Sequence, residues 1–90
     1  MRENEVEKFL ILKVRAVGGD CIKLNSASMN GLPDRIILMP GGKIYFVELK
    51  APGKKPRLLQ DVIHKKLRDK GFKVFVIDTK EKVGEFINGI

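Results

Sequence analysis

The chain has 90 residues, which is the size of one domain, and we expect that domain to span residues 1–90. Its hydrophobic content of 43% argues against disorder, and its single cysteine, Cys21, excludes an internal disulfide and a zinc knuckle. The formal net charge of +7 favours a polyanionic partner, with nucleic acid ahead of an anionic membrane surface.

The first third of the chain predicts a helix, a short strand and a loop. Apolar residues recur at helical spacing from Val6 to Val17, and the Gly18-Gly19 pair that follows is a common helix end. Residues 21–24 then favour a strand. Residues 25–33 are rich in Asn, Ser and Gly, which is typical of a loop.

Two strands joined by a tight turn are predicted next, at residues 35–39 and 44–47. The turn sequence Pro40-Gly41-Gly42 suits a three-residue hairpin loop, in which a type I turn precedes a residue in the left-handed region. Counting back along both strands from this loop places Asp34 opposite Glu48. A two-residue loop would pair Asp34 with Leu49 instead.

The opposition of Asp34 and Glu48 predicts a site for a divalent cation. Directly opposed residues have Cβ atoms about 5 Å apart, so both carboxylates reach one ion. Lys50 lies two residues beyond Glu48 and therefore on the same face. Phosphodiester hydrolysis needs an activated water and stabilisation of charge on the phosphate, which a cation and a lysine supply. The alternative is a surface hairpin with an ordinary Glu-Lys pair.

The second half of the chain predicts a helix at residues 57–70, a strand at 74–77 and a last helix capped by Asp78 or Thr79. The strand-helix-strand segment across residues 44–77 predicts a right-handed crossover, so the fold class is α/β with a mixed sheet in the order α-β-β-β-α-β-α. The buried stripe of the middle helix is assigned to Leu59, Val62, Ile63 and Leu67.

The first helix offers a third acid. Glu3 shares a face with the apolar residues of that helix and could point toward the sheet. Glu7 lies one turn further along and is the competitor. The alternative for both is a solvated first turn, where acids favour the helix dipole.

Further polar residues come from the segment that follows Lys50. Gln60 borders the stripe of the middle helix, where it either binds a phosphate or the metal-bound water, or faces solvent. His64 lies further from the stripe and is assigned to the surface. Phosphate contact is expected from three basic residues in and beside the loop at 51–56: Lys54, Lys55 and Arg57.

In these residues the chain resembles a stand-alone virus-type replication-repair nuclease (VRR-NUC) domain of the PD-(D/E)XK superfamily. The resemblance covers nearly the whole chain. It implies a restriction-endonuclease-like αβββαβ core with a C-terminal helix, dependence on Mg²⁺ or Mn²⁺, and cleavage of branched DNA. It also implies that the main-chain carbonyl of Leu49 is a metal ligand. The matching positions are Glu3, Gly31-x-Pro33-Asp34, Glu48-Leu49-Lys50 and Gln60.

Compact members of this family are similar to Holliday-junction resolvases, which implies a homodimer that cuts four-way junctions. We therefore expect a metal-dependent, structure-specific DNA endonuclease, with Asp34, Glu48 and Leu49 holding the metal and Glu3 joining them, if at all, through water. No small-molecule substrate is expected. No membrane partner is expected either, because no apolar run is long enough to span a bilayer. The expected location is the cytoplasm of a bacterial or phage-infected cell.

Three alternatives share the same residues. A flap or nicking endonuclease would use the same site, and RNA cleavage is open as well. A non-catalytic basic DNA-binding module would explain the charge, although binding alone needs no acids that face a phosphate.

Overall fold

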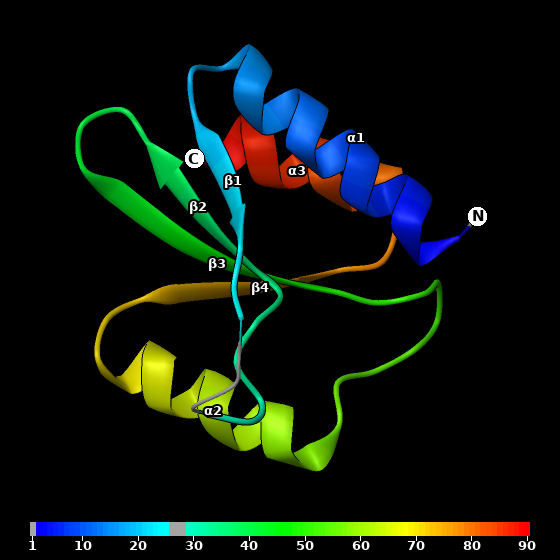
Figure 1. Cartoon of the computed structure of the whole chain (residues 1–90), viewed down its shortest axis with the longest axis vertical. Helices are drawn as coiled ribbons and strands as arrows, with labels where there is room; N and C mark the ends of the chain where they lie inside the picture. Colours follow the sequence, from blue (N-terminus) through cyan, green and yellow to red (C-terminus); the bar gives the residue numbers. More distant parts are fainter. Residues whose placement is uncertain (1, 26–28) are drawn as a thin grey trace.

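The computed structural model describes residues 2–25 and 29–90, which form helices packed on both faces of a central sheet (Figure 1). The order is the predicted α-β-β-β-α-β-α. In chain order the elements are α1 (Glu3–Ala16), β1 (Asp20–Lys23), β2 (Arg35–Met39), β3 (Lys43–Leu49), α2 (Leu58–Asp69), β4 (Lys73–Ile77) and α3 (Lys80–Gly89).

The sheet is mixed, as predicted. Its strand order is β1-β2-β3-β4, with antiparallel pairing from β1 to β3 and parallel pairing between β3 and β4. Parallel neighbours need a crossover connection, and α2 supplies it. The free edges of the sheet are therefore β1 and β4. Among the described residues, no helix combines the length and apolarity needed to cross a membrane.

The hairpin between β2 and β3 has the predicted register but not the predicted turn. Met39 pairs with Lys43, as a three-residue loop requires. Gly41 has a φ of 84°, however, whereas the third residue of a type I turn has a negative φ. A positive φ after Pro40 is the type II pattern, and the predicted turn type is wrong. The register survives because the loop length is unchanged.

Most of the core lies between the sheet and the helices α1 and α3, which cover one face together (Figure 1). α1 contributes Val6, Leu10 and Val14, all with no exposed surface. Burying each such side chain contributes roughly 1.5–3 kcal/mol. Thr79 caps α3, because its hydroxyl accepts a hydrogen bond of 3.1 Å from the Lys82 N–H.

The other face of the sheet carries α2, and here the predicted stripe is right at Ile63, which is buried, and at Leu67, which is half-buried, but wrong at Leu59 and Val62. Leu59 and Val62 are 52% and 48% exposed, while the buried residues of α2 are Gln60, Ile63 and His64. The predicted surface position of His64 is also wrong, since this side chain is 1% exposed. The helix therefore turns Gln60 and His64 toward the sheet together with Ile63, and turns Leu59 and Val62 toward solvent.

Candidate active site

Asp34 is fixed at the start of β2 by a loop that packs against α2. Gly31 has a φ of 90°, and a Cβ at this position would lie 2.9 Å from the Leu59 carbonyl oxygen, so only glycine fits. Pro33, which follows in the loop, is fully buried. The Leu24 N–H donates a 2.8 Å hydrogen bond to the Asp34 carbonyl. The loop thus presents Asp34 beside the end of β3.

Asp34 and Glu48 are neighbours across the hairpin. The ladder pairs Arg35 with Val47, and its next position carries the two acids. The Leu49 N–H donates a 2.9 Å hydrogen bond to Asp34 Oδ2, which ties that carboxylate to β3. Burial raises the pKa of Glu48, and the nearby charge of Asp34 raises it further. The counted register is confirmed from Met39–Lys43 to Arg35–Val47, and Asp34 and Glu48 are the residues that follow this last pair on the two chains.

The Glu48 carboxylate is buried with one oxygen engaged and the other free. Oε2 accepts a 2.7 Å hydrogen bond from Gln60 Nε2 and lies 3.1 Å from Lys50 Nζ. Oε1 has no hydrogen-bond partner within the part of the chain that is described, and Glu48 is 1% exposed. An unpartnered buried carboxylate oxygen is costly unless it has a ligand. A hard divalent cation beside Asp34 would fit these donors.

Gln60 joins the start of α2 to the site. Its Oε1 accepts a 3.0 Å hydrogen bond from the Arg57 N–H, and its Nε2 holds Glu48. The side chain is 8% exposed, which excludes the solvent-facing alternative. With both amide atoms engaged, Gln60 orients the Glu48 carboxylate so that Oε1 is left for a ligand.

The structure does not bring Glu3 to the two acids. Glu3 is exposed in the first turn of α1. Glu7, the competitor, is engaged by Arg35, with Nε and Nη2 each 3.0 Å from Glu7 Oε2. In the described ranges, no three His, Cys, Asp or Glu side chains are grouped to hold a metal. The site as folded therefore offers the Asp34 and Glu48 carboxylates and nearby main chain.

Open space lies on both sides of Asp34. One hollow of about 470 Å³ is lined by residues that include Asp34, Arg57, Leu59 and Gln60. A second hollow of about 590 Å³ is lined by Lys23, Leu24, Asn25 and Asp34. An extended, charged chain could therefore pass over Asp34 with cations on either side.

The basic loop between β3 and α2 ends at Arg57, which lines the first hollow. The side chains of Lys54, Lys55 and Arg57 are exposed. The loop is held by the Gly53 N–H, which donates a 3.1 Å hydrogen bond to Asp78 Oδ2 at the end of β4. Three cations are thus presented to solvent between β3 and α2, and one of them, Arg57, lines the hollow that Asp34 also lines.

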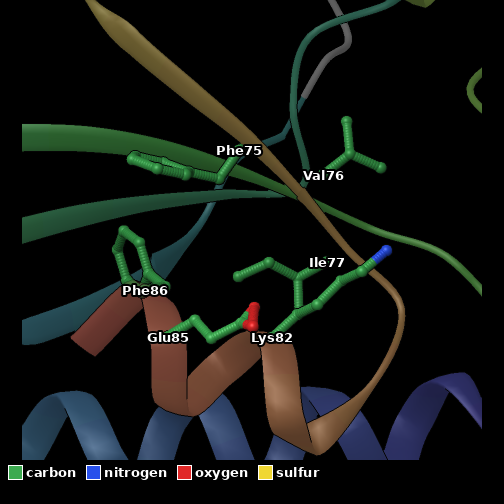
Figure 2. Close-up of a pocket in the computed structure, with 6 residues that line it drawn as sticks. All are labelled: Phe75, Val76, Ile77, Lys82, Glu85 and Phe86. Atoms are coloured by element: carbon green, nitrogen blue, oxygen red, sulfur yellow. The ribbon is translucent and has the colours of Figure 1, made fainter. Parts of the chain in front are cut away.

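A third hollow, of about 320 Å³, lies between β4 and α3, away from these residues (Figure 2). Phe75, Ile77 and Phe86 form its apolar walls, with Lys82 and Glu85 beside them. It contains one carboxylate and no second acid to share a cation. It is therefore not the candidate active site.

His64 is the residue near the site that the sequence interpretation missed. It lies one turn after Gln60 on the buried face of α2, and its Nε2 has no hydrogen-bond partner among the described residues. Burial lowers the pKa of His64, and the charges of Arg68 and Lys50 lower it further. The available signal was the i, i+3, i+4, i+7 series Gln60, Ile63, His64 and Leu67, which is a helix face in its own right.

His64 should make the fold sensitive to acid. Because its pKa is below the ordinary 6.5, the unfolded chain takes up a proton first as the pH falls. The stabilising contribution of neutral His64 is complete above pH 6.5 and decreases below it. We expect wild type to lose free energy of unfolding relative to His64→Gln between pH 8 and pH 5, measured by urea unfolding in EDTA. A histidine that titrates at or above 6.5 in the folded protein by NMR would contradict this.

Comparisons with known proteins agree with the fold. No protein-family model matches the chain. The chain is 43% identical over 81 residues to "Putative nuclease p44" of Acyrthosiphon pisum secondary endosymbiont phage 1, covering 90% of this chain and 87% of that protein. A solved structure described as a VRR_NUC domain superimposes with a TM-score of 0.90 at 33% identity, covering 96% of this chain and 94% of the other. The chain therefore belongs to the VRR-NUC family of nuclease domains.

Proposed function

We propose that this protein is a metal-dependent endonuclease that hydrolyses phosphodiester bonds in DNA. The observation that carries the proposal is the Glu48 carboxylate, which is buried beside Asp34 with Oε1 unpartnered in the described chain. A fold that only had to bind DNA would gain nothing from two adjacent acids that repel a phosphate. Nuclease chemistry explains why they are there.

Asp34, Glu48 and the Leu49 carbonyl are the groups we propose as ligands for Mg²⁺ or Mn²⁺. Bound there, the ion would lower the pKa of water and offset negative charge on the phosphate. Asp34 Oδ2 is already held by the Leu49 N–H, and Glu48 Oε2 by Gln60 and Lys50. The two remaining carboxylate oxygens are the ones free to bind. Glu3 would join only if its exposed side chain reached the ion through water.

Lys50 and Gln60 have separate roles in this proposal. Lys50 is 16% exposed at its side chain, so its ammonium can leave Glu48 and meet charge that develops on the phosphate. Gln60 is a positioning residue, because both of its amide atoms are used inside the protein. It keeps Glu48 in one orientation and thereby keeps the site preorganised.

Branched DNA, and a four-way junction in particular, is the substrate we propose. The support is a charge of +7 on a 90-residue chain and a cation-rich loop beside the acids. The relative from a phage is consistent with work inside an infected cell. The test is to incubate the protein with end-labelled junctions, flaps, nicked duplexes, intact duplexes and RNA, with Mg²⁺, Mn²⁺ or EDTA. Junction cleavage only with metal supports the proposal, and preference for flaps or nicks would reassign the substrate.

Charge reversal of Lys54 and Lys55 to Glu should weaken binding to every DNA shape to a similar degree. Each exposed cation that meets a phosphate releases a counterion, so the slope of log K against log salt should fall by about 0.9 for each lost contact. Lys70→Glu, on an exposed residue at the far end of α2, is the matched control. An unchanged salt slope in the loop variant would leave this loop without a role in DNA binding.

We propose that the protein is a homodimer. We assign its interface to the part of the sheet that lies on the same face as α2 and is not covered by that helix. Leu38 and Ile44 are paired on this face and are 36% and 40% exposed, and Ile22, which pairs with Ile36 two residues further along the strand, is 45% exposed. A two-fold dimer brings two active sites to a two-fold junction.

Light scattering should give twice the 10.2 kDa chain mass for wild type, and a lower mass for Ile44→Lys. The control is Leu12→Lys, because Leu12 is 63% exposed on α1, on the other side of the sheet. The monomeric variant should nick junctions without making paired cuts. A wild-type monomer would remove the dimer and the paired cuts while leaving the hydrolysis proposal intact.

A further inference from the structure

Three large aliphatic side chains are exposed next to the candidate active site. Leu58 is 81% exposed, Leu59 is 52% exposed and Val62 is 48% exposed. Val62 lies four residues after Leu58 and three after Leu59 at the start of α2, so it neighbours both leucines on the helix surface. We call these three residues the leucine edge. Single exposed leucines are common on proteins, but three neighbours on one short helix form a patch that suits a partner.

The leucine edge is part of the same surface as the site. Leu59 lines the hollow of about 470 Å³ together with Asp34, Arg57 and Gln60. Leu58 directly follows Arg57, and Lys54 and Lys55 precede it in the basic loop. A DNA strand with a phosphate in the hollow beside Asp34 would therefore have its neighbouring nucleotides at the leucine edge.

We propose that the leucine edge contacts the faces of bases that unstack beside the scissile phosphate, so that the protein selects DNA whose stacking opens easily, as at a branch. This rests on the proposed nuclease function and names the feature of the substrate that the site reads. An intact duplex presents phosphates and sugars to a basic surface and hides its base faces. Aliphatic side chains gain contact area only where bases are unstacked, as apolar wedges do in other DNA-binding proteins.

Charge argues for nucleic acid over a second copy of this chain. A two-fold contact through the leucine edge would place Lys54, Lys55 and Arg57 of one copy near the same cations of the other. Like charges brought together across an interface are unfavourable. A DNA strand instead supplies phosphates for the cations and base faces for the leucines, which satisfies both parts of the surface.

The test compares binding of a four-way junction and of an intact duplex of equal length, in EDTA so that neither is cut. The variant is Leu58→Gln with Leu59→Gln, and the matched control is Leu12→Gln on α1. Both leucines of the variant are exposed, so the fold should tolerate the change. 2-Aminopurine beside the branch reports unstacking by its fluorescence.

We expect the double variant to lose about tenfold in junction affinity and most of the fluorescence rise, with duplex affinity within about twofold of wild type. The salt slope should not change, because no cation is removed. Equal losses of affinity for the junction and the duplex, or no loss of affinity for the junction, would overturn the inference. So would a wild type that gives no fluorescence rise, or a variant that dissociates from dimer to monomer. A wild type with the expected binding pattern and no cleavage in any metal would refute only the nuclease proposal.

Discussion

Asp34→Asn and Glu48→Gln are each expected to lower the cleavage rate on the order of 10³-fold while the fold is kept. Each change removes one of the two carboxylates that face the proposed metal, and the remaining acid alone is a poor ligand set. The hydrogen bonds that hold the site can survive. The amide introduced by Asp34→Asn retains an oxygen for the Leu49 N–H, and the one introduced by Glu48→Gln retains an oxygen for Gln60. Single-turnover cleavage of a labelled junction in Mg²⁺ measures the effect.

Glu48→Gln should also stabilise the protein in EDTA above about pH 5. Burial and Asp34 raise the pKa of Glu48, so the unfolded chain ionises first as the pH rises above the ordinary 4.5. Wild type then loses free energy of unfolding relative to the variant until the folded pKa is passed. Well below pH 4.5 both states are protonated, so the part of the difference that depends on pH should vanish. A variant that is inactive and less stable at every pH would indicate a folding defect and contradict the assignment.

Lys50→Ala is expected to lower the single-turnover rate by on the order of 10²-fold with little loss of DNA affinity. The ammonium lies 3.1 Å from Glu48 Oε2 in this structure, within reach of the space where a phosphate would meet the metal. An interaction that strengthens only as charge develops affects the rate of the chemical step and leaves ground-state binding alone. Rapid-quench cleavage and equilibrium binding in EDTA separate the two quantities.

Lys54→Ala provides the contrast within the same loop. Lys54 is exposed and has no contact with the carboxylates among the described residues, so its loss should weaken binding and leave the single-turnover rate at saturation unchanged. If Lys50→Ala behaved like Lys54→Ala, with affinity lost in proportion and the rate kept, Lys50 would be a binding residue and not part of the chemistry.

The hairpin could be predicted from sequence because its information is local. Strand composition, a turn of fixed length and period-two alternation together set the register, and Asp34 and Glu48 follow by counting. The error in turn type at Gly41 did no harm, since either turn leaves three residues in the loop. This part of the candidate site is thus encoded in residues 34–50.

The side of α2 that is buried against the sheet could not be predicted in the same way, because it does not follow the most hydrophobic series of residues. Two helical series share Ile63 and Leu67, and hydrophobicity favours the one that adds Leu59 and Val62. The structure buries the series with Gln60 and His64, in which Gln60 on α2 donates a hydrogen bond to the buried Glu48 carboxylate on β3. That pairing depends on tertiary contact between residues 12 apart, which no local pattern contains.

The assignment of the helix acid shows a similar limit. Glu3 and Glu7 are one turn apart and share a face, so spacing alone does not separate them. The structure gives Glu7 a structural role through Arg35 and leaves Glu3 exposed. Glu7 is thus held by an ion pair with Arg35, and the sequence pattern does not reveal this pair.

The central claim is that Asp34 and Glu48 together hold a divalent cation. Crystals soaked in Mn²⁺ and measured at a wavelength where manganese scatters anomalously test it most directly. We expect one anomalous peak per chain within coordination distance of Asp34, of Glu48 Oε1 and of the Leu49 carbonyl, and no such peak in Glu48→Gln crystals soaked in the same way. A Mn²⁺ peak elsewhere in wild type, or none at these acids at saturating metal, would contradict the account.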